Sequence, residues 1–170
     1  MIIFVVPKNT YTFALMDKIS QFQGEYKWLS NFWPCSVLLH GRTYQSVEHA
    51  YQASKSNDPI WYDTCSDPDI KAGQIKRLSK SISSQNLWKD WEDIKRPIML
   101  SLLIQKFQSE PFRSQLLNTG DILIEEGNTW GDKFWGIDLK TGNGENYLGQ
   151  YIMFIRDQVI NDTVVPGQLF

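Results

Sequence analysis

Three side chains with catalytic potential share one face of a predicted helix: Glu48, Gln52 and Lys55. Their spacings of four and seven residues place them on the same helical side. A carboxylate beside a positioned lysine tends to stay ionised, which suits a nucleophile or a stabiliser of positive charge. The same spacing also fits a plainer alternative, an exposed ion pair on a helix, which would have little energetic weight.

A second group combines an aromatic ring with cations: Trp91, Lys95, Met99 and Lys106. If the predicted helix is continuous through Pro97, these residues lie along one broad stripe. A tryptophan and two lysines on one side could hold a base and a phosphate. Spacing alone favours an amphipathic helix whose lysines extend into solvent.

The segment 125–136 is rich in glycine and carries carboxylates, an amide and two tryptophans. Loops of this kind often hold binding and catalytic groups, which makes Glu126 and Asp132 candidates for acid–base chemistry. The alternative is a surface turn with aromatic anchors. Tryptophan has no propensity for turns, so we expect Trp130 and Trp135 to pack against something.

The expected start of the last helix carries Gly142, Gly144 and Asn146, with Arg156 farther along. A helix N-terminus preceded by glycines offers free backbone N–H groups to an anion. The alternative is a plain loop leading into a helix.

The composition predicts one globular domain of 170 residues with a net charge of −2, which argues against a general nucleic-acid coat protein. Cys35 and Cys65 are too few for a disulfide framework or a zinc site, so a reduced, cytoplasmic setting is expected. No segment is long and apolar enough to cross a membrane, and no membrane partner is expected. His40 and His49 lack metal-ligand spacing, and we expect neither a metal nor another cofactor.

Periodicity predicts about six helices and a few short strands, an α+β fold that is predominantly helical rather than alternating βαβ. Strands are expected at 22–26, 36–39, 43–44 and 122–124, and helices at 47–56, from 58, from 67 to about 78, within 87–107, from 110 to about 119, and from about 148. Residues 1–18 are expected to form an N-terminal extension or edge strand, 19–162 the domain, and 163–170 a C-terminal tail. No glycine-rich phosphate loop follows a strand and opens a helix, which excludes Rossmann and P-loop interpretations.

An ordered series of motifs resembles the YbiA-like or NADAR family from about Phe22 to about Asp157. The motifs are Leu29-Ser30-Asn31-Phe32 with Pro34; Gly41; Tyr44 through Ala53 with Lys55; Trp91, Met99 and Lys106-Phe107; Thr119-Gly120; Glu126-Gly127-Asn128; Asp132 and Trp135-Gly136; and Gly144, Asn146, Leu148-Gly149 and Arg156. The family often has Gly-Arg where this chain reads Gly73-Gln74. The local phosphate-binding residue is therefore open between Lys76 and Arg77.

The resemblance implies a mostly helical domain with a pocket for a ribosylated base. It implies an N-glycosidase that cleaves a ribosyl phosphate from a base, such as phosphoribosylamino-pyrimidine intermediates of riboflavin synthesis. Two alternatives remain: removal of ADP-ribose from guanine, and a non-catalytic module that binds NAD or ADP-ribose. The partner is thus a small ribosylated base or ADP-ribose-type nucleotide, and nucleic acid only if modified guanine is the substrate.

Roles for the candidate residues follow as a hypothesis. Cleavage of an N-glycosidic bond develops positive charge on the sugar, which a carboxylate stabilises while a second group handles a proton. We expect Glu48 as the main catalytic carboxylate, Asp132 or Glu126 for the proton or water, Trp91 and Trp135 for stacking, Asn31 and Asn146 for base or ribose edges, and Lys55, Lys106 and Arg156 for phosphate. Trp135 and Arg156 are the two of this set most readily explained as structural instead.

Overall fold

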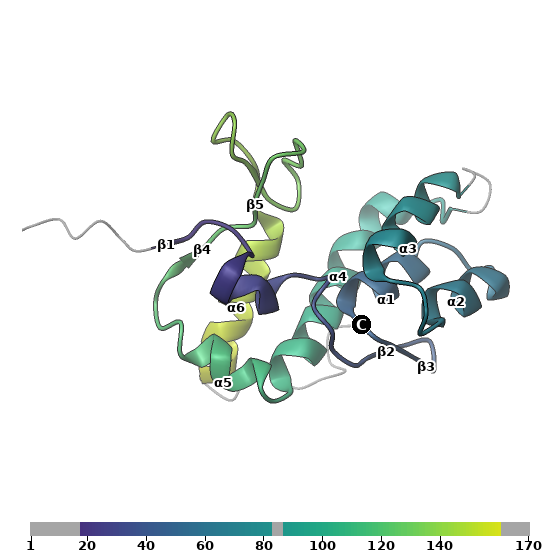
Figure 1. Ribbon diagram of the computed structural model, residues 1–170, viewed down its shortest axis with the longest axis horizontal. Helices are drawn as coiled ribbons and strands as arrows, with labels where there is room; N and C mark the ends of the chain where they lie inside the picture. The colour runs from purple at the N-terminus through teal and green to yellow at the C-terminus, as the bar shows by residue number, and fades with distance from the viewer. Residues whose placement is uncertain (1–17, 83–86, 161–170) are drawn as a thin grey trace, which may run out of the picture.

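The computed structural model describes residues 18–82 and 87–160, and the apolar run 1–6 and the tail 163–170 lie outside the described residues. A central helix, α4, packs against α1 on one side and against α5 and α6 on the other, as Figure 1 shows. The helices are α1 (Val47–Ala53), α2 (Pro59–Ser66), α3 (Ala72–Leu78), α4 (Trp91–Gln108), α5 (Phe112–Leu117) and α6 (Tyr147–Ile160), with the short 3₁₀ helices η1 (Gly24–Leu29) and η2 (Ser79–Ser81). The predicted α+β, predominantly helical fold class is confirmed.

Three pairs of short strands join distant segments. They are β1 (Lys18–Ile19) parallel to β4 (Leu123–Ile124), β2 (Val37–Leu39) antiparallel to β3 (Arg42–Tyr44), and β5 (Gly127–Asn128) parallel to β6 (Ile137–Asp138). The strands predicted near 36–39, 43–44 and 122–124 are confirmed. The strand predicted at 22–26 is wrong, because residues 24–26 form the first half of the 3₁₀ helix η1, which buries Trp28 and Leu29 at its end.

Local capping signals explain most helix starts. The Ser46 hydroxyl accepts from the His49 N–H at 3.3 Å at the start of α1. Asp58 accepts from the Ile60 N–H at 2.9 Å, with proline in the first turn of α2. The third helix begins later than predicted, because Asp67 closes a turn through the Asp69 N–H.

Helix α4 runs without interruption through Pro97. Pro97 is exposed, so its missing N–H and ring lie on the solvent side rather than in the core. The helix buries an apolar stripe in its second half: Met99, Leu102, Leu103, Ile104 and Phe107. This stripe forms the centre of the core, against which both flanking groups of helices pack.

One lysine lies fully inside this core. Lys106 has no exposed surface, and its Nζ donates to the carbonyl oxygens of Ser30 at 2.7 Å and Leu29 at 3.5 Å. Burial lowers the pKa of Lys106 to about 8, although Cys35 opposes the shift. The ammonium group therefore fastens the segment that follows η1 to the central helix.

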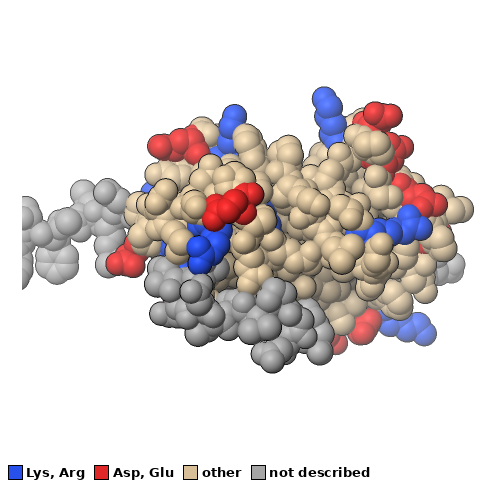
Figure 2. All heavy atoms as spheres, turned by 90° about the horizontal axis from the view of Figure 1, so that it is seen from below, with Lys and Arg blue, Asp and Glu red and all other residues tan. Residues whose placement is uncertain are grey.

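Charged side chains do not gather into one patch on the face shown in Figure 2, where basic and acidic groups are interspersed. This distribution agrees with the small net charge of −2. Across residues 18–82 and 87–160, no helix has the length and hydrophobicity needed to span a membrane.

We expect Lys106→Met to destabilise the protein by about 1–3 kcal/mol, because two buried carbonyl groups lose their donor. Urea denaturation measures this loss. Lys80→Met, which removes an exposed lysine, is the matched control and should leave the midpoint unchanged. Equal midpoints for both variants would contradict the fastening role of Lys106.

Candidate active site

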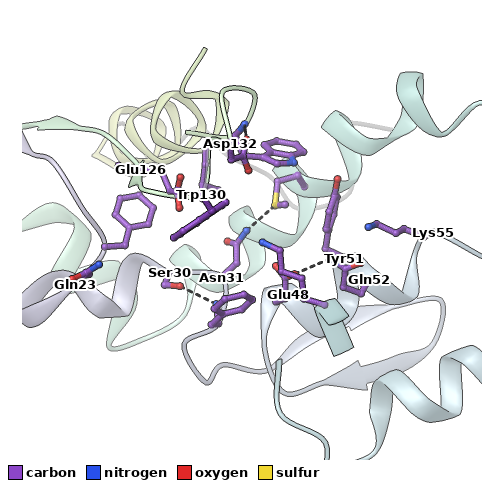
Figure 3. Close-up of a pocket in the computed structure, with 17 residues that line it drawn as sticks. Gln23, Ser30, Asn31, Glu48, Tyr51, Gln52, Lys55, Glu126, Trp130 and Asp132 are labelled. Carbon is purple, nitrogen blue, oxygen red and sulfur yellow. Dashed lines mark hydrogen bonds between the residues drawn. The ribbon is translucent and has the colours of Figure 1, made fainter. Parts of the chain in front are cut away.

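A cavity of about 470 Å³ opens between α1, α3, α4 and the segment around β5, a size that suits a nucleotide-sized ligand. Figure 3 shows the side chains that face it. Six of the predicted site residues line the cavity together with Lys76: Asn31, Glu48, Lys55, Glu126, Asp132 and Trp135. Trp135, one of the two candidates most readily explained as structural, is thus at the cavity.

Two of the three residues predicted on one helical face, Glu48 and Gln52, lie on α1 and are buried, whereas Lys55 lies in the turn beyond Ala53, the last residue of the helix. Glu48 and Gln52 are 5% and 3% exposed, and the Gln52 Nε2 donates to the Glu48 Oε1 at 2.8 Å. Glu48, Gln52 and Lys55 all line the cavity. The alternative of a solvated helical ion pair is therefore wrong.

Opposing effects act on the Glu48 carboxyl. Burial raises its pKa, while Lys76, the Gln52 hydrogen bond and Lys55 lower it. The expectation of a simply ionised carboxylate left out the burial, which favours the neutral form. Ionisation of Glu48 thus depends on the two ammonium groups beside it.

The loop before β2 holds Glu48 in place from the other side. The Asn31 carbonyl accepts from the Glu48 N–H at 2.9 Å, and the Asn31 Nδ2 contacts the Met99 Sδ at 3.4 Å. Lys106 binds the neighbouring Ser30 carbonyl, so consecutive residues of this loop are attached to α4 and to α1. Asn31 therefore lies between the central helix and the catalytic candidate.

Glu126 occupies the other side of the cavity, just before β5. Burial and then the Asp132 charge raise its pKa to about 7, against smaller opposing effects of Asn128 and Lys76. Its backbone N–H donates to the Asn146 Oδ1 at 3.0 Å. A Cβ at Gly136 would lie 1.9 Å from the Glu126 Oε2, so only glycine lets the carboxylate take this place.

Asp132 both faces the cavity and braces its own loop. One carboxylate oxygen, Oδ1, accepts from the backbone N–H groups of Phe134 at 3.0 Å and Trp135 at 2.9 Å. Asn128 closes the loop, since its Oδ1 accepts from the Asp132 N–H at 2.9 Å and its Nδ2 donates to the Asp132 carbonyl at 2.7 Å. The glycine-rich segment is therefore held in one shape.

Lys76 is the cation that the sequence left open against Arg77. Lys76 lines the cavity and acts electrostatically on Glu48, Glu126 and Lys55, whereas Arg77 is exposed and outside the lining. Lys76 follows the buried Ile75 on α3, so its position along the helix was a signal in the sequence. Only the packing of α3 on α1 shows that Lys76, rather than Arg77, faces the cavity.

The tryptophans divide into packed and exposed rings. Trp135 lines the cavity and meets the Tyr51 ring edge-on at 5.7 Å between centroids. Trp91 is behind the wall, 5.3 Å from the Tyr51 ring, so a direct stacking role for it is not supported by its placement. Trp130 is 64% exposed, contrary to the expectation that it packs.

Three candidates are not brought to the cavity, because their polar atoms serve the backbone. Lys106 bonds the carbonyls described above. The Asn146 Nδ2 donates to the Ile124 carbonyl at 2.9 Å while its Oδ1 holds Glu126. The Arg156 Nη1 donates to the Thr119 Oγ1 at 3.0 Å and to the Ile122 carbonyl at 2.9 Å. Structural roles replace the direct ligand contacts expected of these three.

Comparison with known proteins identifies the family of this chain. A family model described as the NADAR domain matches residues 19–160. The chain belongs to the NADAR family. The predicted resemblance is thereby confirmed over most of the sequence.

Relatives of this NADAR chain match at moderate identity. A riboflavin biosynthesis protein of Vibrio vulnificus (strain YJ016) is 37% identical over 77% of this chain, which spans only 35% of that protein. An N-glycosidase of Nostoc punctiforme is 32% identical over 84% of this chain and 91% of its own length. The N-glycosidase YbiA of Escherichia coli (strain K12) is 33% identical over 86% of this chain and 91% of its own length.

The solved structure of the E. coli protein YbiA, determined by NMR, has the same fold. It superposes with a TM-score of 0.72 at 26% identity, covering 88% of this chain and 91% of that chain.

The histidines serve no metal centre in the described part of the chain. His49 is buried, with its Nδ1 2.7 Å from the Ser46 Oγ and its Nε2 2.8 Å from the Ile70 carbonyl oxygen. Across residues 18–82 and 87–160, no three His, Cys, Asp or Glu side chains are grouped as metal ligands would be.

Replacing Glu126 by glutamine should stabilise the NADAR domain at pH 8 and much less at pH 5. The folded-state pKa of about 7 lies above the unfolded value of about 4.3, so ionisation of Glu126 lowers the stability of the folded protein as pH rises through this window. Thermal unfolding at both pH values measures the difference. The exposed Glu145→Gln is the control, and an equal effect of the Glu126 change at the two pH values would contradict the buried environment.

Proposed function

We propose that this NADAR protein is an N-glycosidase that hydrolyses the bond between a ribosyl phosphate and a base. One observation carries the proposal: two buried carboxyl groups, Glu48 and Glu126, face one cavity from different elements and in different electrostatic surroundings. Relatives named N-glycosidase that match over most of their length support it.

The two carboxyl groups suit the two tasks of the reaction. Burial raises the pKa of Glu48, and Lys76, the Gln52 hydrogen bond and Lys55 oppose that shift. Positive charge that develops on a sugar beside it would further favour its ionised form, which places Glu48 to stabilise that charge. Glu126, with a pKa of about 7, carries a proton in a large fraction of molecules near neutrality, which suits a general acid.

The reaction then balances through these residues. The C1′–N bond breaks, its electron pair goes to the nitrogen, and Glu126 gives that nitrogen its proton. Water adds to C1′ while Glu48 faces the developing positive charge, and the proton lost by water returns to Glu126. Asp132, whose Oδ1 is engaged by two backbone N–H groups, keeps the pKa of Glu126 high by its charge.

Two lysines supply the phosphate contacts. Lys55 and Lys76 both line the cavity, and burial lowers the pKa of Lys55 while Glu48 raises it. An anionic phosphate between the two ammonium groups would relieve their mutual repulsion. This pair takes the place of the three basic residues expected from the sequence, of which only Lys55 reaches the cavity.

Among ribosylated bases, we propose a phosphoribosylamino-pyrimidine intermediate of riboflavin synthesis as the substrate. The names of the Vibrio relative and of a maize chloroplastic riboflavin biosynthesis protein, 28% identical over 82% of this chain, support this choice. Release of ADP-ribose from modified guanine, and binding of NAD or ADP-ribose without cleavage, are the alternatives that the test below separates.

Glu48→Gln should reduce turnover by at least about a hundredfold while leaving the fold and ligand binding intact, because the amide keeps the shape and loses the charge. The assay incubates the wild type and the variant with a phosphoribosylamino-pyrimidine, NAD and ADP-ribosylated DNA, and identifies products by mass. Glu145→Gln controls for loss of a surface carboxylate. Binding without release of base by the wild type would overturn the enzymatic proposal.

The pH dependence of kcat/KM should show a limb that falls as pH rises through about 7, because only protonated Glu126 can give the departing base its proton. In Glu126→Gln that limb should disappear together with most of the activity. Steady-state rates between pH 5 and 9 measure it. A rate that rises steadily across this range would remove Glu126 from the role of acid.

A further inference from the structure

Two large aromatic side chains on separate segments lie at the cavity with much of their surface open to solvent. Phe32 is 44% and Trp130 64% exposed, and both line the cavity. Exposed rings of this size at a pocket are typical of surfaces that stack on a flat ligand. The packed rings of Trp135 and Trp91, by contrast, are engaged by Tyr51 and offer less free surface.

Both exposed rings are held on fixed backbone. Trp130 lies inside the loop that Asn128 and Asp132 close with two mutual hydrogen bonds, next to Gly131 with a φ of +84°. Phe32 follows directly after Asn31, and its N–H donates to the Ser30 Oγ at 3.2 Å. A ring presented by a fixed segment loses little freedom on binding, which makes it an effective stacking surface.

One ammonium group lies over both rings. The Lys76 Nζ is 5.4 Å from the Phe32 centroid and 5.9 Å from the Trp130 centroid. The two aromatic residues therefore border a common space at the α3 side of the cavity. A base that stacks on these rings would take the place of this ammonium group, which would turn to the phosphate beside Lys55.

The charged groups differ between the two ends of the cavity. Lys55 and Glu48 influence each other at one end, Glu126 and Asp132 at the other, and Lys76 acts on Glu48, Lys55 and Glu126. Figure 3 shows the same order, with Lys55 and Glu48 on one side of Asn31 and Trp130 and Glu126 on the other.

We propose that Phe32 and Trp130 hold the base of the substrate between them, so that the base lies at the Glu126 end and the sugar phosphate at the Glu48–Lys55 end. This assignment rests on the proposed N-glycosidase function and specifies the orientation of its substrate. It places the nitrogen that leaves the sugar beside the proposed acid, and C1′ beside the carboxylate that stabilises positive charge.

Three probes separate the two ends: adenosine 5′-monophosphate, adenosine and ribose 5-phosphate. Isothermal titration in a Glu48→Gln background keeps the probes uncut. Trp130→Ala and Phe32→Ala each should weaken binding of both adenine-containing probes by about tenfold and leave ribose 5-phosphate unchanged, as expected for loss of a stacking ring. Lys55→Met should weaken the two phosphate-containing probes and leave adenosine unchanged.

Matched variants control for the loss of an exposed ring. Trp88 is 38% and Phe154 44% exposed, and neither lines the cavity, so Trp88→Ala and Phe154→Ala should bind all three probes as before. Trp130→Phe, which keeps a ring, should retain most of the affinity for adenosine. Unchanged melting temperatures of the alanine variants show that the fold is intact.

Two results overturn the proposal: adenosine 5′-monophosphate that binds no more tightly than ribose 5-phosphate, or ring variants that weaken all three probes equally. Binding is measured without turnover, so either result leaves the N-glycosidase function untouched. Absence of base release by the wild-type protein would instead overturn that function and leave the stacking result standing.

Discussion

The burial of a carboxyl group and its amide partner on one short helix is the constraint on which the rest depends. Every residue of α1 is buried, including Glu48 and Gln52, although the helix has only seven residues. A helix this short has little stability of its own, so α2, α3 and α4 must pack around it. Two of these elements, α3 and α4, also line the cavity.

Much of this arrangement was predictable because it is local. The spacing of Glu48 and Gln52, and the serine that caps their helix, are encoded within seven residues, and the structure confirms both, whereas Lys55 reaches the cavity from the turn after the helix. The inner face of that helix was not predictable from spacing, since an exposed stripe has the same pattern. Only contacts with segments far along the chain decide between the two.

The less successful predictions fail for long-range reasons. Lys106 was expected at a phosphate as a cation on the predicted stripe of α4, yet the carbonyl group of Ser30, 76 residues away, binds its ammonium group. Trp130 was expected to pack, but the hydrogen bonds of Asn128 and Asp132 hold its loop without help from the ring. In both cases the deciding partner is backbone, which sequence patterns do not display.

The glycines behind Glu126 restrict which residues can occupy the positions that support this carboxyl group. A Cβ at Gly144 would lie 2.1 Å from the Gly136 carbonyl oxygen, and one at Gly136 would lie 2.1 Å from that of Glu126. Main chain thus packs directly on main chain beneath Glu126, whereas the carboxyl group of Glu48 is held by the Gln52 side chain. Any side chain at Gly136 or Gly144 would therefore collide with backbone and displace the loop that carries Glu126.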